Sequence, residues 1–172
     1  MSFNLKNIKT KKFKAVEGFS LIELMVTLFI VAILMSWAVP SFRGFLIRQS
    51  IRLQSNGLIA DLIFAKSSAI NLSRYIVVQS KNDLDWSDGW WIYIDANHNQ
   101  KKDDPSDILL RDVGYASDGL EIVSSTNSIL FNTVGFSPTG SVNVDVSHPE
   151  SSKKIKVKVA ASGGITSTST NI

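Results

Sequence analysis

The sequence predicts an α+β fold in which one long N-terminal helix packs on an antiparallel β-sheet head. Three observations predict it: an apolar run over residues 19–39, a helical spacing of apolar residues that resumes after Pro40 and runs to about Ser73, and short alternating segments from Tyr75 onwards. A long helix followed by several strands is typical of an α+β domain. The 172 residues suit one such domain plus an anchor.

The apolar run over residues 19–39 contains a single charge, at Glu23. About 20 apolar residues in a helix span the hydrocarbon core of a bilayer. Lysines before the run and a neutral run after it place the N-terminus in the cytoplasm and the rest of the chain outside. The run exceeds the roughly 7–15 apolar residues of a secretory signal peptide, and no small-x-small cleavage site follows it. A plain membrane anchor is the alternative, but it gives Glu23 no partner to offset a cost of about 3 kcal/mol in the membrane.

The basic residues of the chain are concentrated at its start. Five lysines and one glutamate precede Gly18, so the remaining chain is nearly balanced in charge and its pI gives no reason to expect nucleic-acid binding. The chain has no cysteine, which excludes zinc–thiolate sites, disulfides and thiol nucleophiles. His98 and His148 are far apart in the sequence, and no catalytic motif surrounds either. We therefore predict that the protein is not an enzyme.

The segment Gly18–Leu24, at the start of the apolar run, has the sequence GFSLIEL. This segment resembles the class III signal of type IV pilins and type II secretion pseudopilins. In that family a prepilin peptidase cuts after the glycine on the cytoplasmic side and methylates the new N-terminal amine. The resemblance implies cleavage between Gly18 and Phe19, N-methylphenylalanine at Phe19, and assembly roles for Glu23 and for the helix-kinking Pro40. Glu23 of an incoming subunit would then pair with the N-terminal amine of its neighbour.

The resulting organisation has four parts. They are a cleaved leader over residues 1–18, a transmembrane helix over 19–39, an amphipathic helix over 40–73 and a β-rich periplasmic or extracellular head over 74–172. We expect Pro40 to bend the helix or to melt it locally, because proline lacks a backbone donor. One apolar face of the second helical part is expected to pack on the sheet, and it consists of Ile51, Leu58, Leu62, Ala65, Ala69 and Leu72.

Three arginines, Arg43, Arg48 and Arg52, follow the apolar run at its outer end. Lipid headgroup contact and filament packing are the two interpretations of these side chains. The predicted strands of the head are Tyr75–Gln79, Gly89–Asp95, Ile108–Val113, Gly119–Ser124, Ser128–Phe131, Ser141–Val146 and Lys153–Ala160. In the second of them, Trp90, Ile92 and Ile94 are expected to face one way and Trp91 and Tyr93 the other.

Three segments of the head relate the chain to a narrower group within this family. Gly89–Asn99, Leu109–Arg111 and Phe136–Gly140 resemble the FimT/GspH group of minor pilins and pseudopilins. This implies a type IV pilin-like fold and a structural subunit of a type IV pilus or of a type II secretion pseudopilus. The implied location is the bacterial inner membrane, in a single pass, and then the filament. The implied partners are other pilins, the prepilin peptidase, the inner-membrane assembly platform and membrane lipid. The sequence does not choose between the two machines.

A polar loop offers oxygen ligands at alternating positions, namely Asp95, Asn97 and Asn99, as the first half of a calcium loop does. The second half lacks the turn glycine and the bidentate glutamate, although Asp103, Asp104 and Asp107 follow. A loop held by Asx-turns is the alternative to a Ca²⁺ site. The sequence requires no other cofactor.

Lys154, Lys156 and Lys158 alternate with apolar residues and predict a lysine-bearing face on one strand. A solvated face or a guarded edge strand is one interpretation, and contact with DNA phosphates is the other. Some minor pilins of this group bind DNA for natural transformation through a C-terminal Gly-Arg-x-Arg motif. The matching positions here are Gly163–Thr166, where both arginines are absent. The alternative function is DNA uptake, in which the lysine-bearing face would contact DNA in place of the absent arginines.

Overall fold

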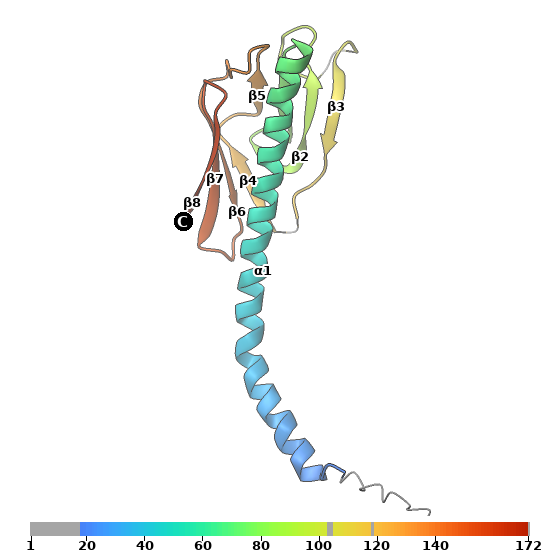
Figure 1. Cartoon of the computed structure of the whole chain (residues 1–172), viewed down its shortest axis with the longest axis vertical. Coiled ribbons are helices and arrows are strands. Elements are labelled where there is room, and N and C mark those ends of the chain that lie inside the picture. The colour runs from blue at the N-terminus through green and yellow to red at the C-terminus, as the bar shows by residue number, and fades with distance from the viewer. Residues whose placement is uncertain (1–17, 103–104, 118, 172) are drawn as a thin grey trace, which may run out of the picture. The chain divides into compact units, whose positions relative to one another are not determined.

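The computed structural model describes residues 18–102, 105–117 and 119–171, so the leader before Gly18 lies outside the described residues. The chain divides into two compact units, residues 1–40 and residues 41–172. The described residues form one helix, α1 (Leu21–Leu72), and eight strands (Figure 1). The strands are β1 (Ile76–Asn82), β2 (Asp85–Ile94), β3 (Ile108–Val113), β4 (Glu121–Ser124), β5 (Ser128–Phe131), β6 (Val142–Ser147), β7 (Lys153–Val159) and β8 (Ile165–Asn171).

The first unit contains the apolar part of α1. Its large apolar side chains are exposed on every side, from 46% at Val31 to 81% at Trp37. A helix that is apolar all round needs an apolar environment, and this one is long and apolar enough to cross a membrane. Helical residues continue through Pro40 without interruption, so the expectation of a locally melted helix at this proline is wrong.

The second unit contains the rest of α1 and the sheet. The predicted apolar face of the helix is buried at five of its positions, which are Ile51, Leu58, Leu62, Ala65 and Ala69. Leu72 is 50% exposed, so the prediction was wrong there. The reason is that Leu72 is the last residue of α1, one turn beyond the last buried position.

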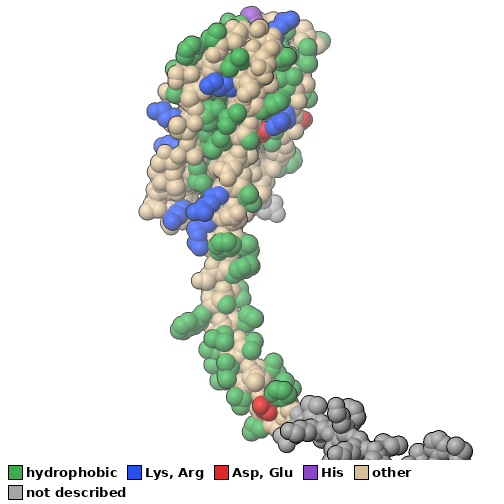
Figure 2. Space-filling model, in the orientation of Figure 1, with side chains coloured by type: hydrophobic (Ala, Val, Ile, Leu, Met, Phe, Trp, Pro, Cys, Tyr) green, Lys and Arg blue, Asp and Glu red, His purple; other side chains and the backbone are tan. Residues whose placement is uncertain are grey.

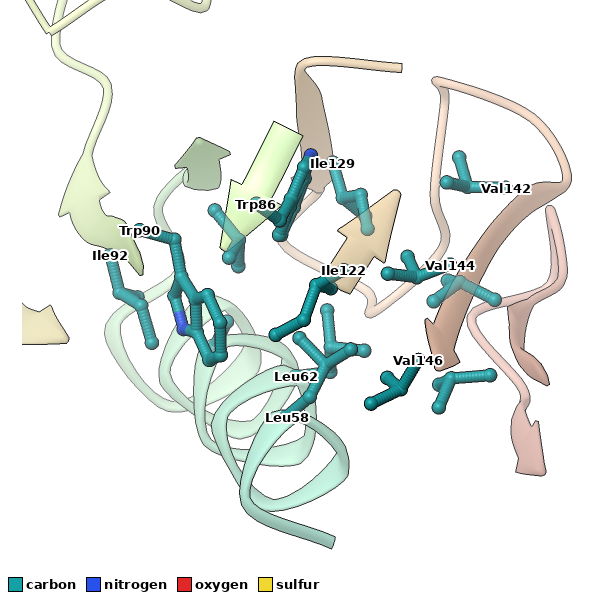
Figure 3. Close-up of a cluster of buried hydrophobic side chains, with 14 of the residues drawn as sticks. Leu58, Leu62, Trp86, Trp90, Ile92, Ile122, Ile129, Val142, Val144 and Val146 are labelled. Atoms are coloured by element: carbon teal, nitrogen blue, oxygen red, sulfur yellow. The ribbon is translucent and has the colours of Figure 1, made fainter. Parts of the chain in front are cut away.

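The sheet runs in the order β5-β1-β2-β4-β6-β7-β8, with β3 added alongside β2, and all its pairings are antiparallel. Its core lies between the sheet and α1. Figure 3 shows Leu58 and Leu62 of the helix pointing at Trp90, Ile122 and Val146, which belong to three different strands. Burial of these side chains holds helix and sheet together at about 25 cal/mol per Å² of apolar surface removed from water.

The two faces of β2 behave as the alternation predicts. Trp90 and Ile92 are buried in the core against α1. Tyr93 is buried in a second cluster on the opposite face of the sheet, with Val77 and Leu130, and Trp91 packs against that cluster. The fold class and the alternation are therefore confirmed.

The strand pattern misses one element. The sequence does not predict β8, which pairs with β7 over its whole length, from Val159 opposite Ile165 to Lys153 opposite Asn171. Because β8 reads Ile-Thr-Ser-Thr-Ser-Thr-Asn, it has only one apolar residue and shows no apolar alternation. β7 consequently lies inside the sheet, and its interpretation as a guarded edge strand is wrong.

Candidate functional site

The residues at the predicted cleavage point are exposed and precede the helix. Gly18, Phe19 and Ser20 have no helical or strand structure, and α1 begins at Leu21. A Cβ added at Gly18 would meet nothing within 4 Å, and this glycine does not have a positive φ. The described part of the fold therefore gives no packing or backbone reason for glycine at this position.

The start of α1 is capped by Ser20. The backbone N–H of Glu23 donates a hydrogen bond to Ser20 Oγ at 3.2 Å. Ser20 and Glu23 have the Ser-x-x-Glu spacing of a capping box, a local sequence signal for a helix start that the apolar pattern alone does not contain. Glu23 also lies in the first turn, where the helix dipole favours a carboxylate. This carboxylate thus has a local role in addition to the assembly role that the family resemblance implies.

A second site that sequence reasoning missed joins α1 to the sheet. Asp61 of α1 is 7% exposed and accepts a hydrogen bond from Trp90 Nε1 of β2 at 3.1 Å. Its other carboxylate oxygen pairs with Arg111 of β3, whose guanidinium lies 4.1 Å from the ring centroid of Phe64. We call Asp61, Trp90 and Arg111 the helix–sheet clamp. The clamp fixes β3, which pairs with β2 only, to the helix.

We expect Asp61→Ala to lower the free energy of unfolding of the full chain by about 2–3 kcal/mol. It leaves the Trp90 indole N–H and the Arg111 guanidinium without their shared partner, and half-exposure of Arg111 keeps the loss below that of a fully buried pair. Denaturant unfolding in detergent, followed by tryptophan fluorescence, measures it. Glu121→Ala, at an exposed position of β4, is the control with an expected change within about 0.5 kcal/mol. Equal stability of the two variants would contradict the clamp.

The lysine-bearing face of β7 is partly neutralised within the sheet. Lys154 and Lys156 both lie near Asp145 of β6, with nitrogen–oxygen distances of 3.3 and 3.9 Å. Lys158 is exposed and stands opposite Asn143. Two of the three candidate DNA contacts therefore share an internal counter-ion, which weakens a phosphate-binding face.

We expect joint replacement of Lys154, Lys156 and Lys158 by alanine to leave DNA retention by the full chain unchanged, because the Asp145 carboxylate offsets part of the positive charge of this face and the DNA-binding arginines of the group are absent here. A filter-binding measurement at about 50 mM salt tests it, since low salt exaggerates any phosphate contact. A clear drop in DNA retention would restore the DNA-uptake alternative.

The turn that carries Gly163 packs against the turn around Gly135 and Ser137, at the start of the segment Phe136–Gly140 that resembles the FimT/GspH group. Ser137 N–H donates to the Ala161 carbonyl at 2.9 Å, and Lys66 Nζ donates to the Gly163 carbonyl at 2.9 Å. Gly163 has φ +75°, and a Cβ there would lie 1.8 Å from the Gly135 carbonyl oxygen. Gly163 is therefore required by close packing of two turns, a role independent of any nucleic acid.

The polar loop after β2 is held by its own side chains. Asp95 is 1% exposed, and its two carboxylate oxygens accept the backbone N–H groups of Asn99 and Gln100 at 3.2 and 2.9 Å. Asn97 Oδ1 accepts from Asn99 N–H, and Asn99 Oδ1 from Lys101 N–H. These contacts build the Asx-turn alternative. No group of three His, Cys, Asp or Glu side chains suited to a metal occurs in the described residues, and Asp103 and Asp104 lie outside them.

Comparison with known protein families gives two matches along the chain. The family described as type II transport protein GspH matches residues 54–163, and the prokaryotic N-terminal methylation motif matches residues 13–39. A comparison with curated protein sequences finds no match.

Two crystal structures of the type IV minor pilin FimU from Pseudomonas aeruginosa are similar to this chain. One has a TM-score of 0.60 at 20% identity and covers 71% of this chain and 90% of FimU. The other has a TM-score of 0.55 at 18% identity and covers 71% and 92%. At this identity the likeness concerns the fold, which is the one built above from α1 and the antiparallel sheet.

Proposed function

Because the chain belongs to the GspH family and is a minor pilin or pseudopilin, we propose that it acts by assembly into a filament rather than by catalysis. The methylation motif over residues 13–39 carries the proposal. It coincides with an exposed Gly18–Phe19 bond and with a helix that is apolar on all sides. Family membership implies that the partners are other pilins.

The proposed sequence of events starts in the inner membrane, with residues 21–39 spanning it and the leader in the cytoplasm. The prepilin peptidase then cuts after Gly18 and methylates the amine of Phe19. The Ser20 cap survives this cut, so the mature helix keeps its start. The assembly platform moves the subunit into a bundle of like helices, where Glu23 pairs with a neighbour's N-terminal amine.

Deletion of the gene in its host tests this function. The expected result is loss of surface filaments or accumulation of secreted proteins in the periplasm, and either phenotype also identifies the machine. A plasmid copy of the wild-type chain should restore the phenotype, and a copy lacking residues 19–39 should not. Normal filaments and normal secretion in the deletion strain would contradict the proposal.

A further inference from the structure

A basic hollow lies at the end of the head where the Ser41 end of α1 meets β7 and β8. Arg48, Ile51 and Arg52 of α1 line it together with Lys153 and Ile155 of β7 and Ser169 of β8, around a volume of about 40 Å³. A second hollow of about 170 Å³ shares Arg48 and Arg52 and adds Phe45 and Gln49. Figure 2 shows Lys and Arg side chains gathered at this end of the head. We call Arg48, Arg52 and Lys153 the basic triad.

The basic triad has no counter-ion among the residues that the structure describes. Arg43, five residues before Arg48, pairs with Glu150 at 2.6 Å, and the other ion pairs of the head involve Asp61, Asp112 and Asp145. Arg48 and Arg52 are spaced i, i+4 and so lie on one helix face, where like charges repel each other. Three cations around one hollow therefore favour an anion, and the described residues of the head do not supply one.

The chain places this hollow near the end of its apolar surface. Exposed apolar side chains continue past Pro40 as Phe42, Phe45 and Leu46, which are 62, 54 and 49% exposed. Arg48 follows Leu46 by two residues, or about 3 Å of helix. In the proposed topology residues 21–39 span the hydrocarbon core, so Arg48 follows the span by nine residues, or about 14 Å of helix. The headgroup layer reaches roughly 5–8 Å outside the core, and a long arginine side chain can extend towards it.

The position of three arginines relative to the membrane span gives a second reason to look for their ligand. Basic residues close to the outer end of a span oppose its orientation, because lysine and arginine favour the cytoplasmic side. Arg43, Arg48 and Arg52 lie on the side that must be exported, and only the lysine-rich leader outweighs them. Membrane insertion itself therefore does not explain these three charges.

We propose that the basic triad binds the phosphate of an anionic phospholipid headgroup while the subunit is anchored in the membrane, before it enters the filament. Two guanidinium groups match phosphate oxygens in geometry and charge, and the Lys153 ammonium adds a third donor. Bound headgroup would hold the head against the bilayer surface until assembly. The inference rests on the proposed membrane anchoring and adds a lipid-binding site to it.

Native mass spectrometry of the full chain in non-ionic detergent tests the site. The chain is titrated with short-chain phosphatidylglycerol, with short-chain phosphatidylcholine and with inorganic phosphate. We expect phosphatidylglycerol to bind, phosphatidylcholine to bind more weakly, and inorganic phosphate to compete only at far higher concentration. The variant R48A/R52A/K153A should lose phosphatidylglycerol affinity by on the order of 10- to 100-fold.

The matched control R74A/K101A/K158A removes the same charge at exposed positions away from the hollow and should bind as wild type. Equal lipid binding by the two triple variants would overturn the inference, as would phosphate and phosphatidylglycerol binding with the same affinity. Unchanged lipid binding with loss of filament incorporation in R48A/R52A/K153A would assign the hollow to a neighbouring subunit instead. Carbonate extraction of membranes tests anchoring separately, so failure of the anchor is distinguishable from failure of the site.

Discussion

Glu23→Gln is expected to give a subunit that is processed and stable in the membrane but absent from filaments. The substitution removes the charge and keeps the size of the side chain. In lipid, the neighbour's N-terminal amine would then lack its partner, and breaking one half of a buried ion pair costs about 3–5 kcal/mol. That corresponds to a loss of at least about 100-fold in the equilibrium for incorporation. Comparison of sheared filament and membrane fractions by immunoblotting measures it.

Ser20→Ala is the matched control for this experiment. The backbone N–H of Glu23 donates to Ser20 Oγ at the start of α1, so a defect at Glu23 could arise from a poorly formed helix start. Ser20→Ala removes the cap, costs about 1 kcal/mol of helix stability and leaves the carboxylate charge in place. Near-normal incorporation of Ser20→Ala beside failure of Glu23→Gln assigns the effect to charge. Equal failure of both variants would contradict the pairing and favour the capping role.

Gly18→Glu is expected to abolish removal of the leader. Gly18 is exposed, a side chain there meets nothing within 4 Å, and its φ is not positive. Substitution therefore leaves the fold unchanged, and any effect arises from the peptidase. The full-length chain should accumulate in the membrane, which an electrophoretic shift of the leader's length detects. Normal cleavage would show that the peptidase does not recognise this position, whereas reduced folding of the head would contradict its independence from Gly18.

Periodic patterns predicted the parts of the fold that depend on periodicity. The 3.6-residue spacing through Leu58 and Leu62 identified the buried face of α1, and the two-residue alternation at Trp90 and Trp91 identified the two faces of β2. The pattern failed at β8 because an edge strand of serine and threonine needs no apolar face. Its pairing comes from the backbone of β7, which no local pattern in β8 records.

The helix–sheet clamp shows a different limit of prediction from sequence. Asp61 and Arg111 are 50 residues apart and lie in unrelated elements, so only the packed fold brings them together. Asp61 even interrupts the apolar face of α1, and its burial is explained only by Trp90 and Arg111. The capping box at Ser20, by contrast, is a local signal that could have been read from the sequence. The basic triad falls between these cases, because Arg48 and Arg52 are evident in the sequence and Lys153 is not.

The intact mass of the chain recovered from sheared filaments or pseudopili of its native host tests the central claim most directly. The account predicts loss of residues 1–18 together with one methyl group, about 14 Da above the mass of the cleaved chain. That result would establish processing between Gly18 and Phe19 in a chain that has reached the filament. A full-length mass in a host with a working prepilin peptidase would contradict the account and leave Glu23 in an ordinary membrane anchor.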